Sequence, residues 1–182
     1  MPQPVLNSER IASVFGNYGV ELLAQSAAER TSCLYSVSAQ QRTCRTLAVV
    51  LFAADADHGI AVSMQRIRAG ASLGATLQAD GWAVAKRNRW LADYDVDPVA
   101  MPVVARLLRL QRRERLALHV YDLEAVRSDR RLQIATVIEL HHPDYLDAAD
   151  LRRIYRDLPA AGSSQAERAR WLQRLAAIPE RS

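Results

Sequence analysis

The chain has 182 residues and a mass of 20.3 kDa, which is enough for one domain with a self-sufficient hydrophobic core. Hydrophobic residues make up 49% of it and charged residues 24%, which excludes a disordered chain, and no segment approaches the ~20 apolar residues of a membrane span. The N-terminus has no basic start followed by an apolar run, so we expect a cytoplasmic protein without a secretory signal.

Arginine supplies almost all of the positive charge. The formal net charge is +4 at pH 7, and Lys86 is the only lysine. Guanidinium groups form paired hydrogen bonds with carboxylates and phosphates, so this bias favours an acidic ligand, an acidic partner or nucleic acid. Codon composition alone is the alternative explanation.

The two cysteines, Cys33 and Cys44, lie on segments that could pair as a hairpin. A disulfide between them is geometrically conceivable. Reduced and buried thiols are the favoured interpretation, because the chain has a large apolar fraction and no sign of secretion.

The N-terminal segment predicts a helix, a turn and a strand. Asn7 or Ser8 can cap a short helix, and Gly16 can end it. The glycine-containing turn that follows leads into a strand over 20–25.

The next segments predict a hairpin and a third strand. Residues 31–37 and 43–53 are rich in β-branched and aromatic side chains and are separated by a polar stretch, which is typical of a hairpin. In 59–68, the alternation of apolar and polar residues favours a strand, and a helix remains the open alternative.

The rest of the chain alternates between helices and strands. We expect, in order, a helix within 70–81, a strand over 82–91, a helix beginning near Pro102, a long hairpin of 116–126 and 131–141, and two terminal helices over 147–156 and 164–177. Asp147 caps the first terminal helix, and Ser164 with Glu167 forms a capping-box pattern at the start of the second. The expected fold is therefore α+β, a single domain over 1–182 in which 7–146 form a core with a mainly antiparallel sheet and 147–182 a helical appendix.

The densest basic cluster lies in the helix predicted near Pro102. At 100° per residue, Arg106, Arg109 and Arg113 gather on one side, with apolar residues on the other. A solvated helix face explains this pattern. The alternatives are a surface for nucleic acid or an acidic partner, and a lid over an anionic ligand.

Glu139 is the most informative residue of the late strand. Alternation places it on one face with Ala135, Val137 and His141, just before Pro143 ends the strand. If this face is covered, the carboxylate needs a cationic or hydrogen-bonding partner, because an isolated buried charge is too costly.

Common catalytic motifs are absent from the sequence, including those for nucleotide binding, zinc hydrolysis, CxxC redox chemistry and serine hydrolysis. Glu139, His141, His142 and Asp144 have metal-ligand types, but alternation directs His142 away from the other two, so the sequence predicts no metal site. The remaining histidines, His58 and His119, suggest only ordinary surface or core positions.

Three short patterns, in order along the chain, resemble chorismate lyase and the related ligand-sensing domains of bacterial transcription regulators. They are Arg45 at the start of an apolar strand, Leu73-Gly74 at the start of a helix, and Glu139-x-x-x-Pro143 at the end of a late strand. The resemblance covers about residues 7–146 and excludes the terminal helices. It implies an antiparallel sheet with helical flaps over an internal pocket.

The resemblance also implies roles for these residues. Arg45 and a backbone amide at Leu73 or Gly74 would hold the carboxylate of an aromatic acid, and Glu139 would act at the hydroxyl or ether end as a general acid. We therefore expect binding of a small aromatic carboxylate, with cleavage of chorismate to 4-hydroxybenzoate and pyruvate as the implied reaction and no cofactor. The alternatives are a non-catalytic ligand-binding module, a structural Arg45–Glu139 ion pair, and an interaction module with an arginine-rich surface.

Overall fold

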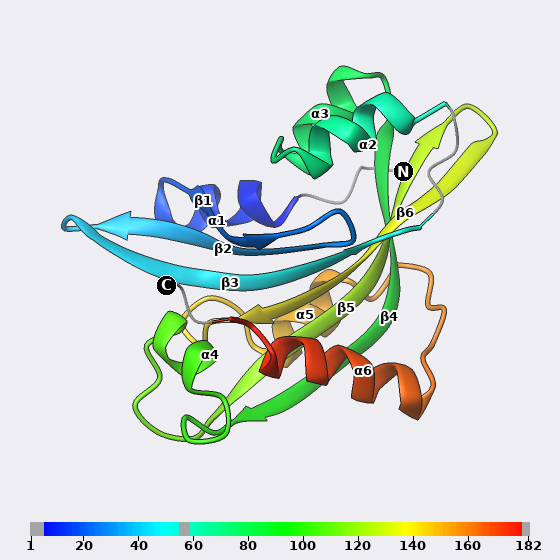
Figure 1. Ribbon diagram of the computed structural model, residues 1–182. Coiled ribbons are helices and arrows are strands. Elements are labelled where there is room, and N and C mark those ends of the chain that lie inside the picture. Colours follow the sequence, from blue (N-terminus) through cyan, green and yellow to red (C-terminus); the bar gives the residue numbers. More distant parts are fainter. Residues whose placement is uncertain (1–5, 55–58, 180–182) are drawn as a thin grey trace.

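The protein is an α+β structure built on one antiparallel sheet, as the sequence predicts. The computed structural model describes residues 6–54 and 59–179 (Figure 1). The strands are β1 (Gly19–Gln25), β2 (Glu29–Ser38), β3 (Gln41–Phe52), β4 (Ala83–Val96), β5 (Glu114–Arg127) and β6 (Arg130–His141). The helices are α1 (Asn7–Phe15), α2 (Ala61–Arg68), α3 (Leu73–Ala79), α4 (Pro102–Leu107), α5 (Ala148–Ile154) and α6 (Gln165–Ala176).

The six strands are hydrogen-bonded in the order β1-β2-β3-β6-β5-β4, and every neighbouring pair is antiparallel. The late hairpin β5–β6 therefore lies between β3 and β4, and β6 pairs with β3 in the centre of the sheet. This pairing places Glu139 opposite Ala48, next to the long apolar strand β3.

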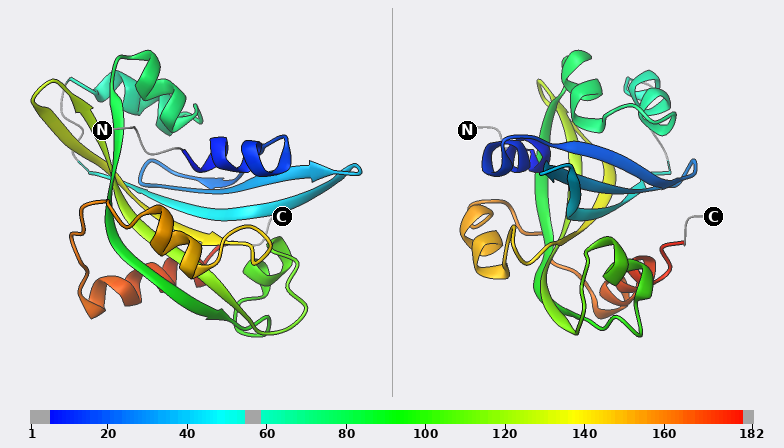
Figure 2. Two further views of the ribbon diagram at one scale, coloured as in Figure 1. Left: turned by 180° about the vertical axis from the view of Figure 1, so that it is seen from behind. Right: turned by 90° about the vertical axis from the view of Figure 1, so that its left-hand side faces the viewer.

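The sheet is covered on both faces (Figure 2). On one face, α4 and α6 pack against Leu47, Ile138 and Leu118 in the largest core cluster. On the other face, α1 and α5 pack around Ile11 and Leu151, and α2 and α3 cover the end of the sheet near Val50. The face with α1, α2, α3 and α5, called the pocket face below, carries Glu139 and His141.

The segment 59–68 is a helix, so the expectation of a strand is wrong. Ile60, Met64 and Ile67 are buried, and their spacing of four and three residues places them on one side of α2. The alternation of Ile60, Val62 and Met64 suggested one buried strand face, but Val62 is 69% exposed.

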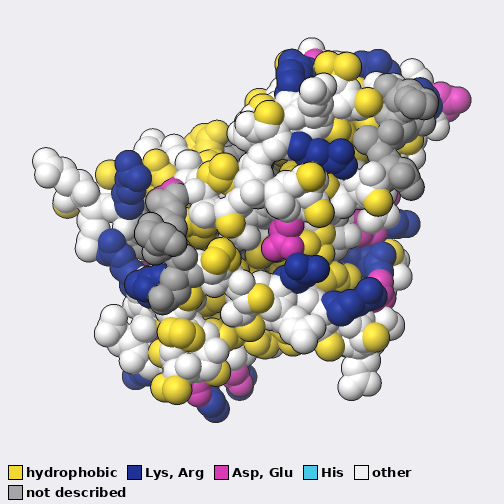
Figure 3. Space-filling model, viewed as in Figure 1, with side chains coloured by type: hydrophobic (Ala, Val, Ile, Leu, Met, Phe, Trp, Pro, Cys, Tyr) yellow, Lys and Arg dark blue, Asp and Glu magenta, His cyan; other side chains and the backbone are white. Residues whose placement is uncertain are grey.

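The arginine-rich helix is shorter than its pattern suggests. α4 ends at Leu107, and Arg109 has a positive φ of 56°, which a helix does not allow. Arg109 donates a hydrogen bond to the Arg42 carbonyl oxygen, and Arg113 forms an ion pair with Asp97. Because α4 ends before Arg109, Arg106, Arg109 and Arg113 do not form one helical surface. Lys and Arg side chains lie at several separate places on the face shown in Figure 3.

The terminal helices pack on the sheet. Trp171, Leu175 and Ile178 of the α6 region belong to the largest core cluster. Asp147 caps α5 and Ser164 caps α6, as the sequence predicts. Both form a capping box with the residue three positions later, which the sequence predicts for Ser164. These caps satisfy backbone N–H groups that would otherwise lack partners at the helix starts.

Cys33 and Cys44 form a disulfide between β2 and β3. Their Cα atoms are 5.7 Å apart, within the usual range for this bond. The expectation of two reduced thiols is therefore wrong, because the register of the hairpin brings the two side chains together on the same face. Among the described residues, no helix is long and apolar enough to cross a membrane.

Candidate functional site

A pocket of about 310 Å³ opens on the pocket face of the sheet, between the strands and the flanking helices α1 and α3. Its wall is mostly apolar, with polar side chains at a few positions. The apolar lining includes Leu6, Val20, Leu22, Leu34, Ala48, Val50, Leu123 and Val137, and the polar lining includes Asn7, Ser8, Arg30, Ser32, Ser72, Lys86, Tyr121 and Glu139.

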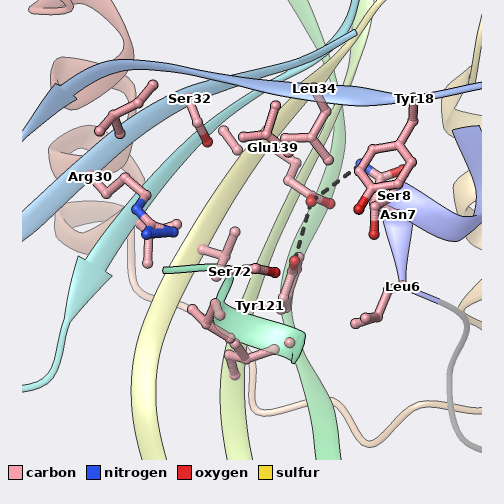
Figure 4. Close-up of a pocket in the computed structure, with 18 of the residues that line it drawn as sticks. Leu6, Asn7, Ser8, Tyr18, Arg30, Ser32, Leu34, Ser72, Tyr121 and Glu139 are labelled. Carbon is pink, nitrogen blue, oxygen red and sulfur yellow. Dashed lines mark hydrogen bonds between the residues drawn. The ribbon is translucent and has the colours of Figure 1, made fainter. Parts of the chain in front are cut away.

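Glu139 lies in the wall of this pocket and is 3% exposed. Its Oε1 atom accepts a hydrogen bond from Asn7 Nδ2 at 3.3 Å and another from the Tyr121 hydroxyl at 3.2 Å (Figure 4). Asn7 is the first residue of α1, so the helix that begins there carries one of the two donors. The side chain that the sequence suggested as a helix cap instead points inward, toward the sheet.

Arg30 is one of the two cationic side chains in the pocket lining, and Lys86 is the other. Arg30 comes from β2 and lies to one side of the cavity, while Glu139, Tyr121 and Asn7 lie to the other (Figure 4). One guanidinium nitrogen donates to the carbonyl oxygens of Ile67 and Ala71, at 3.0 and 2.7 Å. Burial lowers the pKa of Arg30 from its ordinary value, but a guanidinium remains charged at any physiological pH.

Leu73 and Gly74, which the resemblance singles out for binding a carboxylate, lie at the start of α3 and line the pocket. A Cβ atom at Gly74 would lie 2.7 Å from Leu6 Cδ1. Since Leu6 lines the same pocket, the glycine allows α3 and the start of α1 to approach each other at the pocket wall.

Arg45 is not among the residues that line the pocket. The register between β2 and β3 shifts at this position, and the resulting bulge leaves Arg45 without a register partner in β2. Its Nε donates to Ser36 Oγ at 2.8 Å, and its guanidinium stacks on the Phe15 ring at 3.9 Å from the centroid. The resemblance implied that Arg45 lies in the pocket. In the structure, the arginine that lines the pocket is Arg30.

The pocket wall continues into a cluster of buried polar and aromatic side chains. His119 faces Glu139 across β5 and β6, and its ring packs against Tyr121 and Tyr155. The Lys86 ammonium lies over the same two tyrosine rings, 4.3 Å from the Tyr121 centroid and 5.3 Å from that of Tyr155. Burial raises the pKa of Tyr121, so its hydroxyl keeps its proton and donates to Glu139.

The histidines of this cluster are neutral near pH 7. Burial lowers the pKa of His119 well below its ordinary value, and it lowers the pKa of His141 to about 4 against an opposing effect of Glu139. His142 points elsewhere, and its Nδ1 accepts a hydrogen bond from the Asp144 amide. His58 lies outside the described residues.

Comparison with known proteins does not identify a family for this chain. No protein-family model matches this chain, and a search of curated proteins finds no match.

Sequence patterns did not indicate Arg30, Tyr121 or His119 as site residues. Each sits within a strand whose alternation shows only which face it shares with its neighbours. The one available signal for His119 and Tyr121 is that a histidine and a tyrosine alternate within the apolar segment 116–126.

Proposed function

We propose that the protein binds a small aromatic carboxylate in the pocket. Arg30 would pair with the carboxylate, and Glu139 with Tyr121 would contact a polar group at the opposite end of the ring. The observation that carries this proposal is a buried arginine and a buried glutamate at opposite sides of one mostly apolar cavity. A volume of about 310 Å³ is at the small end of ligand pockets and suits one substituted ring.

The apolar wall supports an aromatic ring between the two polar ends. Leu34, Val50 and Val137 line the cavity from neighbouring strands, and burial of a ring against such side chains contributes favourable free energy in proportion to the area covered. Ser32 and Ser72 add hydroxyl groups that can donate to the carboxylate. The resemblance to chorismate lyase implies the same class of ligand.

The resemblance extends the proposal to a reaction, the cleavage of chorismate to 4-hydroxybenzoate and pyruvate. In this elimination the bond from the ring carbon to the ether oxygen breaks, and the neighbouring ring carbon loses a proton, which makes the ring aromatic. The departing enolpyruvate takes up a proton and becomes pyruvate. We assign to Glu139, supported by Tyr121, the proton transfer at the ether end.

Binding is tested by thermal stabilisation and calorimetry with 4-hydroxybenzoate and benzoate, against neutral 4-hydroxybenzamide. The two acids should raise the melting temperature and the amide should not, because Arg30 needs an anionic partner. Arg30→Gln should abolish the effect. Arg45→Gln is the matched control, since Arg45 is similarly buried but does not line the pocket.

The variants of Arg30 and Arg45 show which guanidinium binds the carboxylate. Loss of binding in Arg45→Gln with retention in Arg30→Gln would reassign the carboxylate to Arg45. Arg30→Lys, which keeps a positive charge, should retain partial binding and shows whether the loss in Arg30→Gln comes from unfolding. If none of the acids binds the folded wild-type protein, the proposal is rejected.

Catalysis is tested separately by incubating the protein with chorismate and following 4-hydroxybenzoate. A rate above the uncatalysed reaction, lowered in Glu139→Gln and less so in Tyr121→Phe, would support the lyase reaction. Binding of 4-hydroxybenzoate without turnover of chorismate would instead identify a non-catalytic binding module.

A further inference from the structure

Three side chains with metal-binding groups meet on the pocket face of the sheet, beside the pocket. His119 on β5 lies opposite Glu139 on β6 in the strand register, and His141 lies two residues further along β6 on the same face. One potential ligand atom from each side chain lies within 4.8 Å of the others, and all three residues are at most 3% exposed.

Each of the three side chains has a buried polar atom without a hydrogen-bond partner in the described part of the chain. These atoms are His119 Nδ1, Glu139 Oε2 and His141 Nε2. The other such atoms within 6–54 and 59–179 are all arginine Nε atoms. A buried polar atom without a partner is energetically costly, so three on adjacent side chains indicate an occupant that is not part of the chain.

The same side chains are held in place through their other polar atoms. Asn88 donates from Nδ2 to the Tyr155 carbonyl oxygen, so its Oδ1 is the atom that accepts from His119 Nε2 at 2.8 Å. The proton on Nε2 leaves a lone pair on His119 Nδ1, which is the atom without a partner. Asn7 and Tyr121 hold Glu139 Oε1 in the same way and leave Oε2 free.

His141 follows the same pattern. Its Nδ1 lies 2.9 Å from Thr46 Oγ1. When Nδ1 donates to this hydroxyl, the Nε2 lone pair is available to a cation. Glu139 Oε2 lies 3.8 Å from His141 Nε2, which is too long for a hydrogen bond between the two.

We propose that His119, Glu139 and His141 bind a divalent transition metal of the Zn²⁺ type. Ligand atoms around a tetrahedral Zn²⁺ lie about 2.0–2.1 Å from the metal and therefore about 3.4 Å from one another, which requires side-chain shifts of about 1 Å. Two imidazoles and one carboxylate select such a metal over Mg²⁺ or Ca²⁺, which prefer oxygen ligands. Hydrogen bonds from a second layer of residues to each ligand are also usual for metal-binding histidines and carboxylates.

The nearby lysine does not take the place of this cation. The Lys86 Nζ atom interacts with the rings of Tyr121 and Tyr155 and donates to the Tyr155 hydroxyl at 3.4 Å. It thus leaves the three unsatisfied atoms without a partner. A buried water molecule is the remaining rival occupant.

The test uses the full-length protein without a histidine tag. Metal content is measured by mass spectrometry after purification, and again after chelation and titration with ZnCl₂ alone. We expect one Zn²⁺ per chain and a higher melting temperature with the metal. Substitution by Co²⁺ should give the strong visible absorption of a four-coordinate site.

The variants His119→Gln and His141→Gln should weaken Zn²⁺ binding on the order of 100-fold or more, and Asn88→Ala about 10-fold through loss of the bond that orients His119. His142→Gln is the matched control, because this neighbouring histidine bonds to the Asp144 amide instead and should leave binding unchanged.

A folded wild-type protein that takes up neither Zn²⁺ nor Co²⁺ in a one-to-one ratio would overturn the proposal and leave water as the occupant. Equal losses in His142→Gln and His119→Gln would do the same. If the ligand variants do not fold, the wild-type stoichiometry and the Co²⁺ spectrum still decide. None of these readouts involves the aromatic acid, so they are independent of the proposed function.

Discussion

His119 and Glu139 face each other as a register pair of β5 and β6, and both are buried on the pocket face of the sheet. This pairing places an imidazole beside the carboxylate that lines the pocket. Tyr121 and Asn7 hold one oxygen of Glu139 and leave the other without a hydrogen-bond partner among the described residues. The pocket and the polar cluster behind it therefore share Glu139.

Acid should destabilise the metal-free protein between about pH 6.5 and pH 4. In the folded state burial lowers the pKa of His141 from 6.5 to about 4, and burial lowers the pKa of His119 in the same direction. The unfolded chain takes up these protons first as the pH falls, so stability is full above pH 6.5 and is lost toward pH 4. We expect a loss on the order of 1–3 kcal/mol in urea unfolding, measured with chelator at pH 7 and pH 4.5.

The control for this effect is His141→Gln, which cannot titrate in this window. Its free energy of unfolding should depend less steeply on pH than that of the wild type. Parallel pH profiles for the two proteins would show that the acid sensitivity comes from other groups.

Reduction of the disulfide between Cys33 and Cys44 should lower the melting temperature without abolishing the fold. The bond closes a short loop across the β2–β3 hairpin, and a loop of this size contributes about 2–3 kcal/mol. Unfolding with and without reductant measures the difference, and the intact mass under non-reducing conditions verifies the bond. Cys33→Ser with Cys44→Ser should behave like the reduced wild type and should not respond to reductant.

Ser164→Ala should cost about 1 kcal/mol of stability, because Ser164 caps α6 by accepting from the Glu167 amide. The cost reaches the whole fold since Trp171 and Leu175 of this helix belong to the largest core cluster. Ser163→Ala is the matched control. Ser163 precedes the cap and accepts only an exposed hydrogen bond from Arg168, so its loss should change the free energy of unfolding by a few tenths of a kcal/mol.

Gly74→Ala should weaken binding of 4-hydroxybenzoate more than it changes stability. The added methyl would lie 2.7 Å from Leu6 Cδ1, so Leu6 must turn at the pocket wall. The better helix propensity of alanine, about 1 kcal/mol, offsets part of that cost. Calorimetry measures the affinity, and combining the change with Leu6→Ala should restore space. Unchanged affinity in the single variant would show that this wall does not contact the ligand.

The sequence by itself determined much of the local structure, although it did not identify the helix α2 or the end of α4. Alternation in 131–141 predicted β6 and the face that carries Glu139, and the capping patterns at Asp147 and Ser164 predicted where α5 and α6 begin. These features depend on residues close together in the chain, so their physical causes, side-chain period and capping hydrogen bonds, are readable in sequence order.

Only the tertiary structure decided which side chains meet. Arg45 lies over Phe15 of α1 and outside the pocket, whereas Arg30 of β2 lines it. The pairing of β5 with β6 brings His119 to Glu139. Strand register and bulges follow from packing between distant segments, and a shift of one residue moves a side chain to the opposite face, so alternation within one strand leaves these neighbours undetermined.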